Sequence, residues 1–151
     1  SLNHRLNILG YLDLSAYGEK YYNSANVGNA DMVAALHWIQ DNIAGFGGDP
    51  GNVTLFGQSS GGMKVYSLMN TPAAEGLFHK GIIQSGVIEE GKKEAEDDGT
   101  AIVEALLTEL KLESVEDLET IPYYFLAEAY NKVSPKLQEK GLYVGGEPRA
   151  N

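Results

Sequence analysis

The chain has 151 residues, 43% of them hydrophobic, so it is long enough and apolar enough to bury a core. Its net charge of −10 argues against nucleic acid and against an anionic membrane surface as partners. The sequence has no cysteine, which excludes a disulfide framework, a thiolate metal site and a catalytic thiol. No apolar run reaches the length of a membrane span, and a cytoplasmic location is slightly favoured because neither cysteine nor a signal peptide is visible.

The first predicted elements are a strand end, a loop and a helix. Residues 1–6 look like the end of a strand, and the turn-rich residues 7–27 are expected to form a long surface loop of the kind that often borders a site. A helix is predicted from about Asn29 to Ala44, with Asn29 as its N-cap, because apolar side chains recur at helical spacing. These side chains belong to Met32, Ala35, Leu36, Ile39 and Ile43.

Two short apolar runs follow and are predicted to be buried strands. Val53 to Phe56 form the first, after which a glycine-rich turn leads to helical spacing from Met63 to Met69. Gly81 to Gln84 form the second. The order strand, helix, strand, helix, strand over residues 1–86 predicts an α/β fold with parallel strands and a site at their carboxyl ends.

The remaining residues, 87–151, change character and are predicted to form a helical segment of the same domain. A charged linker runs from Glu89 to Gly99, and the final ten residues show no regular element. Between them, an amphipathic helix is predicted from Ala101 to Leu110. A second helix is predicted to start at Ser114, which would cap it, and a third is predicted from Pro122 to a limit at Pro135.

Gly57-Gln58-Ser59-Ser60-Gly61 has the G-x-S-x-G pattern of a nucleophile elbow. Such a serine stands on a strained turn between a strand and a helix, with its oxygen facing a cleft. Gly57 and Gly61 lack the Cβ atoms that would clash where strand and helix cross. The positive end of the following helix favours negative charge on a substrate oxygen. The alternative interpretation is that Ser59 is a turn serine that caps the helix.

A serine nucleophile also needs a histidine base and a carboxylate, and in this fold both follow the serine. His4 and His37 precede Ser59. His79 lies just before a strand, where we expect it to face away from the site, and Glu75 is the sole acidic residue between Ser59 and His79. None of the three histidines is therefore expected to be the base.

The oxyanion site is incomplete in the same way. In such a site two backbone N–H groups donate hydrogen bonds to the negatively charged substrate oxygen, and the N–H of Ser60 can be one of them. The second should come from a glycine-rich loop after an earlier strand, and no such loop precedes Ser1. The chain is therefore expected to be an internal piece of a larger enzyme. Missing sheet neighbours would leave strand edges and apolar faces exposed.

The stretch from Ala44 to Ser59 resembles the signature of the type-B carboxylesterases, the family that includes cholinesterases and bacterial para-nitrobenzyl esterases. The resemblance is very specific over residues 1–86, and from residue 87 the sequence is compatible with the family's variable helical region. Further matches are Asn3 to Leu6, Asn26 to Gly28 with Asp31, Gly76 to His79, and Gln84 to Gly86.

This resemblance implies a partial α/β-hydrolase fold and hydrolysis of small-molecule carboxylic esters through an acyl-enzyme. Ser59 matches the nucleophile and the Ser60 N–H matches one oxyanion donor, while the family's acid and histidine would fall beyond Asn151. The isolated chain is therefore expected to be inactive without the remaining segments of the parent. The family needs no cofactor and no metal. The same alignment implies that Arg5 and Asp31 form a buried pair behind the site.

The sequence departs from the family pattern at three positions, none of which removes the nucleophile. Gln58 stands where many members have Glu, Ser60 replaces Ala or Gly, and Ala25 replaces Gly. Two other functions stay open. A non-catalytic member of the same fold could act as an adhesion or binding module, and a lipase or peptidase would differ only in its substrate.

Overall fold

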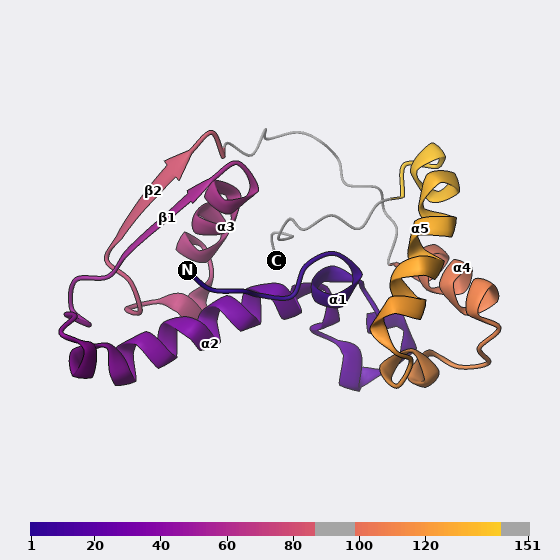
Figure 1. Cartoon of the computed structure of the whole chain (residues 1–151), viewed down its shortest axis with the longest axis horizontal. Coiled ribbons are helices and arrows are strands. Elements are labelled where there is room, and N and C mark those ends of the chain that lie inside the picture. The colour runs from indigo at the N-terminus through magenta and orange to yellow at the C-terminus, as the bar shows by residue number, and fades with distance from the viewer. Residues whose placement is uncertain (87–98, 143–151) are drawn as a thin grey trace. The chain divides into compact units, whose positions relative to one another are not determined.

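The computed structural model describes residues 1–86 and 99–142, which divide into two compact units (Figure 1). The core unit consists of residues 1–11 and 25–86, and the helical unit consists of residues 12–24 and 99–142. The predicted linker, apart from Gly99, and the predicted irregular C-terminal end, apart from Leu142, lie outside the described residues.

The core unit alternates helices and strands along the chain. Its helices and strands are α1 (Ile8–Tyr11), α2 (Val27–Asn42), β1 (Thr54–Gln58), α3 (Ser60–Met69) and β2 (Lys80–Gln84). Short 3-10 helices cover Ser24–Asn26 at its boundary, Ile43–Phe46 and Pro72–Ala74. The predicted helix around Leu36 and the two strands are therefore present, with boundaries shifted by one or two residues.

β1 and β2 are parallel neighbours, with Thr54 opposite Lys80 and Gln58 opposite Gln84. They run in the same direction because α3 and the following turn carry the chain back between them. α3 packs against both strands. Both strands therefore end at the same edge of the sheet, and Ser59 directly follows the end of β1.

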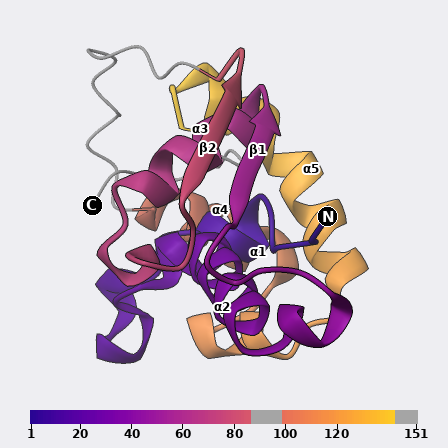
Figure 2. The ribbon, with the colours of Figure 1, turned by 90° about the vertical axis from the view of Figure 1, so that its left-hand side faces the viewer.

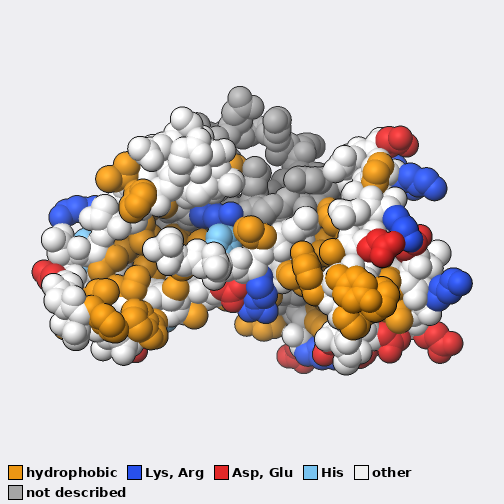
Figure 3. Space-filling model, viewed as in Figure 1, with side chains coloured by type: hydrophobic (Ala, Val, Ile, Leu, Met, Phe, Trp, Pro, Cys, Tyr) orange, Lys and Arg blue, Asp and Glu red, His pale blue; other side chains and the backbone are white. Residues whose placement is uncertain are grey.

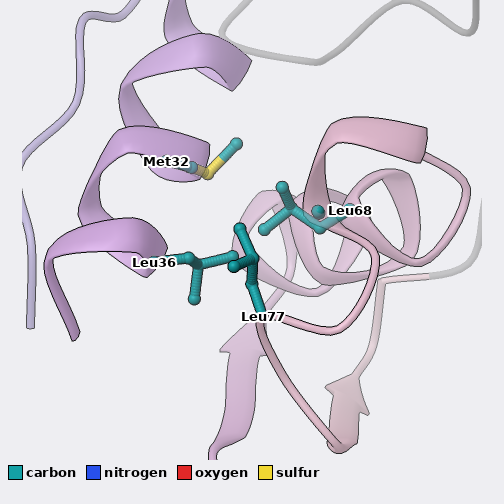
Figure 4. Packing of buried hydrophobic residues seen from close by; sticks show 5 residues of the cluster. Met32, Leu36, Leu68 and Leu77 are labelled. Atoms are coloured by element: carbon teal, nitrogen blue, oxygen red, sulfur yellow. The ribbon is translucent and has the colours of Figure 1, made fainter. Parts of the chain in front are cut away.

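The apolar core of this unit lies between α2, α3 and the connection from α3 to β2. Met32 and Leu36 of α2 point toward Leu68 of α3 and toward Leu77 (Figure 4). Leu36 is only 1% exposed, so burying its side chain contributes about 2 kcal/mol to folding. This packing fixes α3, the helix that follows Ser59, against α2.

One face of the two-stranded sheet is exposed, which corrects the prediction of buried strands. Phe56 of β1 and Ile82 of β2 are directly opposite in the register and are 76% and 51% exposed. Figure 2 views the strands from this side, with α3 on the other. No described element of the core unit covers this face, so the expected exposure of apolar surface is confirmed.

The N-terminal residues differ from the prediction in three ways. Residues 1–6 form no strand, because no described strand pairs with them. The predicted loop over residues 7–27 contains α1 and short 3-10 helices, and it buries Tyr11 and Tyr21 instead of exposing them. The next helix, α2, begins at Val27 after Asn26, so Asn29 is not the cap but a buried residue within the first turn.

The helical unit is built on two α-helices that pack together, α4 (Thr100–Leu110) and α5 (Tyr123–Glu139). Short 3-10 helices cover Ser15–Tyr17, Glu19–Tyr21 and Val115–Glu119. A capping box joins Ser114 to Asp117, in agreement with the predicted helix start. The buried side chains of the helical unit include Ile102, Val103, Leu106, Val115, Leu126, Ala129 and Tyr130.

Pro135 does not limit the last helix but lies inside α5, which continues to Glu139. A proline within a helix removes one backbone hydrogen bond. Here Pro135 and Asn131, whose carbonyl loses that bond, are both exposed, so water can satisfy the carbonyl. Leu137, which is 6% exposed, provides buried contact beyond the proline. The exposed carbonyl and this buried contact let the helix continue past the proline.

Residues 12–24 are held in the helical unit by polar contacts to Glu119. The Tyr21 hydroxyl and the Lys20 ammonium both donate hydrogen bonds to the Glu119 carboxylate, the latter at 2.9 Å. The hydrogen bond from Tyr21, followed by that from Lys20, lowers the pKa of Glu119. A segment predicted as a plain loop is thus anchored by specific side chains.

Hydrophobic side chains also gather at the surface of each unit (Figure 3). In the core unit the rings of Trp38 and Phe46 lie 5.9 Å apart and are 52% and 75% exposed. In the helical unit the rings of Tyr124 and Phe125, at the start of α5, stack at 4.1 Å and are 62% and 44% exposed. Exposed patches of this kind favour association of the isolated chain.

Candidate active site

Ser59 occupies a strained turn between β1 and α3. Its backbone has φ 53° and ψ −123°, a conformation that residues with a side chain rarely adopt. The surrounding backbone holds it there, because the Ser59 N–H donates to the Gln84 carbonyl at 2.8 Å. The Ser59 carbonyl accepts from the N–H groups of Gly62 and Met63 at 2.9 and 3.1 Å. These bonds fix an exposed serine side chain at the carboxyl end of the sheet.

The close crossing of strand and helix depends on Gly57. A Cβ atom at Gly57 would lie 2.2 Å from the carbonyl oxygen of Gly61, which is an impossible contact. A Cβ atom at Gly61 would meet nothing within 4 Å, so the expectation that both glycines avoid a clash is wrong for Gly61. Gly86 contributes instead, because its Cβ atom would lie 2.7 Å from Gly62.

Ser60 is the first residue of α3. The first N–H groups of a helix have no intrahelical acceptor and carry the positive end of the helix dipole. The backbone N–H groups at this end therefore offer donors beside Ser59 for a developing negative charge. The side chain of Ser60 is exposed, and only its backbone is needed for this purpose.

No hydrogen bond joins Ser59 to a histidine among the described residues. The Nδ1 atom of His79 accepts a hydrogen bond from the Val53 N–H at 3.2 Å, at the amino ends of both strands. This position is at the opposite edge of the sheet from Ser59, as the sequence predicts. His37 is exposed on α2, while burial, followed by the charge of Lys64, lowers the pKa of His4.

Ser85 is a residue of this region that the sequence pattern does not single out. It directly follows β2, next to the position of Ser59 in the parallel register, and its φ is also 53°. Two serines with the same unusual backbone angle therefore end neighbouring strands. The available sequence signal is the Ser85-Gly86 pair after an apolar strand, which also fits an ordinary turn.

Arg5 and Asp31 form a fork-like ion pair in the core unit. Arg5 donates from Nε to Oδ2 at 2.9 Å and from Nη2 to Oδ1 at 2.6 Å, and its backbone N–H also donates to Oδ2 at 2.9 Å. The side chains are 55% and 24% exposed, so the pair exists but is not buried as expected. The hydrogen bonds from the Arg5 side chain are the main reason that the pKa of Asp31 is lowered.

Asp31→Asn is expected to remove a pH-dependent part of the stability. Because folding lowers the pKa of Asp31, this contribution is present above the unfolded pKa, near 4, and disappears as the pH falls through the folded value. The loss at pH 7 should be at most about 1 kcal/mol, because solvent screens the pair. Urea unfolding of the parent and the Asp31→Asn variant of the full-length protein, at pH 7 and at pH 3, measures this loss of stability.

Asp41→Asn is the matched control, because Asp41 is an exposed carboxylate on the same helix. It should leave the free energy of unfolding almost unchanged at both pH values. An Asp31→Asn variant that loses the same stability at pH 3 as at pH 7 would contradict the assignment of this pH dependence to the ion pair.

The described residues contain no group of three or more histidine and carboxylate side chains that could hold a metal ion. Within the same residues, none of the helices has the length and apolar character that crossing a bilayer requires.

Comparison with known proteins places the chain among esterases. The sequence model of the carboxylesterase family matches residues 1–139. The chain belongs to the carboxylesterase family. The match covers almost all the described residues of both units.

Individual carboxylesterases support the same conclusion. The chain is 45% identical to the para-nitrobenzyl esterase of Bacillus subtilis over 125 residues, which is 78% of this chain and 25% of the relative. It is 48% identical to carboxylesterase 1D of Rattus norvegicus over 88 residues, or 58% of this chain and 15% of the relative. The chain thus spans a quarter or less of the length of these two relatives.

Solved carboxylesterase structures show the same fold. An esterase from anaerobic Clostridium hathewayi, which can hydrolyze aliphatic aromatic polyesters, superposes with a TM-score of 0.90 at 56% identity, covering 100% of this chain and 30% of that one. The carboxylesterase EST55 of Geobacillus stearothermophilus gives a TM-score of 0.78 at 36% identity. This superposition covers 96% of this chain and 30% of EST55. The chain has part of an α/β-hydrolase fold.

Proposed function

We propose that the full-length carboxylesterase hydrolyses carboxylic esters and that Ser59 is its nucleophile. The observation that carries this proposal is the backbone of Ser59, which is held at φ 53° between a parallel strand and the start of α3. A capping serine has no need of this strain, because a cap residue ordinarily has an extended backbone. The Ser59 side chain also makes no capping hydrogen bond to α3.

In the proposed reaction the Ser59 oxygen attacks the ester carbonyl carbon and its proton passes to a general base. The carbonyl oxygen becomes an oxyanion, and the Ser60 N–H donates to it. Collapse of this intermediate expels the alcohol, which takes up the proton, and leaves an acyl group on Ser59. Water then attacks the acyl group and releases the carboxylic acid.

The base and its carboxylate partner are proposed to come from other segments of the parent protein. None of the hydrogen bonds among the described residues joins Ser59 to a histidine or an acidic side chain. The isolated chain is therefore expected to be inactive, since a serine without a base keeps its proton. We also propose that both units belong to one catalytic domain, which the family match across residues 1–139 supports.

The substrate class proposed for the parent is small carboxylic esters. The esterase from Clostridium hathewayi can hydrolyze aliphatic aromatic polyesters, and its 56% identity makes such polymers a reasonable second substrate to test. Release of soluble acid monomers from a polyester film, measured beside hydrolysis of a p-nitrophenyl ester, would show whether this range extends to the present protein.

A covalent serine probe tests the assignment of Ser59. The full-length protein is treated with a fluorophosphonate and digested, and the labelled peptide is sequenced by mass spectrometry. We expect label on Ser59 and none in a Ser59→Ala variant. Label on Ser60 or Ser85 instead would overturn the assignment of the nucleophile. Absence of both labelling and ester hydrolysis would favour a non-catalytic binding module of the same fold.

A further inference from the structure

The first turn of α3 is in contact with the end of β2 as well as with the end of β1. A Cβ atom on Gly86 would lie 2.7 Å from the Cα and carbonyl carbon of Gly62 and from the backbone nitrogen of Met63. Conversely, a Cβ atom on Gly62 would lie 3.1 Å from the Cα atom of Gly86. Both glycines are buried. Their backbones therefore lie directly against each other, with no room for a methyl group on Gly86.

The backbone that follows β2 reaches this contact through a turn. The Ser59 N–H donates to the carbonyl of Gln84, the last residue of β2, at 2.8 Å. Ser85 follows with φ 53°, a positive angle that residues with a side chain rarely adopt, and Gly86 comes next. The chain at the end of β2 thus contacts the nucleophile turn at two points, through Gln84 at Ser59 and through Gly86 at the start of α3.

The peptide group that Gly86 contacts also holds Ser59 in place. It joins Gly62 to Met63, whose N–H groups donate to the Ser59 carbonyl at 2.9 and 3.1 Å. A displacement of this peptide group would therefore move the backbone of Ser59, and with it the direction of the adjoining Ser60 N–H. Catalysis by a positioned nucleophile is sensitive to such movements, because a misplacement of about 1 Å can lower a rate by about 10²-fold.

We propose that Gly86 is a positioning residue for the ester hydrolysis proposed above, on which this inference rests. Because Gly86 has no side chain, the chain after β2 can pack against the first turn of α3 and keep the Ser59 backbone and the Ser60 N–H in place. The residue acts through the backbone of α3 and contributes no group of its own to the reaction. It lies well outside the G-x-S-x-G motif, so the motif does not identify it.

Gly86→Ala in the full-length protein tests the proposal. We expect kcat for a p-nitrophenyl ester to fall by about 10²-fold while KM stays within about threefold of the parent value, because the methyl group moves the nucleophile. Circular dichroism and thermal unfolding measure the folded fraction, so that kcat is expressed per folded molecule. A glycine that only stabilises the fold would leave kcat per folded molecule unchanged, and that result would overturn the proposal.

Gly81→Ala is the matched control, because it adds a methyl group to the same strand away from Ser59. Gly81 is the second residue of β2, and its Cβ atom would lie 3.1 Å from the side chain of Val65 in α3. A side chain can adjust where a backbone cannot, so kcat per folded molecule should stay within about threefold of the parent. Equal losses of kcat in Gly81→Ala and Gly86→Ala would attribute the effect to packing of β2 on α3 in general and would overturn the proposal.

Gly62→Ala keeps the proposal testable if Gly86→Ala yields no folded protein. Its Cβ atom would enter the same contact less severely, at 3.1 Å from the Gly86 Cα atom and from the Gly57 carbonyl oxygen, and alanine favours a helix. The neighbours need to move by only a few tenths of an ångström, so we expect kcat to fall about tenfold. A crystal structure of this variant should show Gly62 displaced from Gly86.

An unchanged kcat in folded Gly62→Ala, or a lower kcat without movement of Gly62 away from Gly86, would overturn the proposal. Failure of the proposed function gives a different result. In that case the parent itself would show no hydrolysis that depends on Ser59, and the positioning role of Gly86 would be rejected together with it.

Discussion

Replacing Ser59 with alanine in the full-length protein is expected to lower kcat for a p-nitrophenyl ester by about 10³-fold or more. The change removes the oxygen that would carry the acyl group, while any remaining rate would come from binding and the oxyanion donors. Steady-state kinetics and circular dichroism measure the activity and the fold together. The alanine removes no bond that the described structure assigns to the serine side chain, so the fold should be preserved.

Ser60→Ala is the matched control for this experiment. Ser60 adjoins Ser59 and has an exposed side chain, but its proposed contribution is the backbone N–H, which alanine keeps. We therefore expect kcat to stay within about threefold of the parent, because at most a weak hydrogen bond is altered. Equal losses in the two variants would contradict the assignment of the nucleophile to Ser59.

Replacing Gly57 with alanine is expected to cost more stability than any other single change considered above. The added methyl group would lie 2.2 Å from the Gly61 carbonyl oxygen and 2.3 Å from its carbon, and both are backbone atoms that cannot rotate away. Separating β1 from α3 would break the turn that holds Ser59. We expect a loss of about 3 kcal/mol or more, measured as a lower unfolding midpoint or as loss of soluble protein.

Gly61→Ala separates this steric effect from a general effect of adding a methyl group to the elbow. The nearby backbone leaves a Cβ atom at Gly61 free of contacts within 4 Å, and alanine favours a helix. This variant should therefore fold with stability close to that of the parent. If Gly57→Ala and Gly61→Ala had the same free energy of unfolding, the close approach of β1 and α3 at Gly57 would not be required for stability.

The elbow could be predicted from the sequence because its signals are local. An apolar strand, a glycine at the crossing and a helical spacing all lie within a few residues of Ser59, and each has a direct backbone meaning. The parallel pairing of β1 and β2 also follows from their order along the chain. The family resemblance was confirmed by the match over residues 1–139.

Other features could not be predicted because they depend on distant neighbours. Residues 1–6 have the pattern of a strand, but a strand also needs a partner to bond with. Phe56 has the composition of a core residue, yet its burial depends on what covers the second face of the sheet. The anchoring of Tyr21 by Glu119 joins segments 98 residues apart, which no local pattern can reveal.

The direct succession of β1, α3 and β2 within residues 54–84 has a consequence for the order of folding. The contacts that hold Ser59 at its unusual angle come from Gly57, Gly62, Met63 and Gln84, all close along the chain. Short loops close quickly and at low entropic cost, so this strand–helix–strand unit should form early. The anchoring of residues 12–24 to Glu119 would come later. In the nascent protein, later segments would therefore assemble around a strand–helix turn that is already in place.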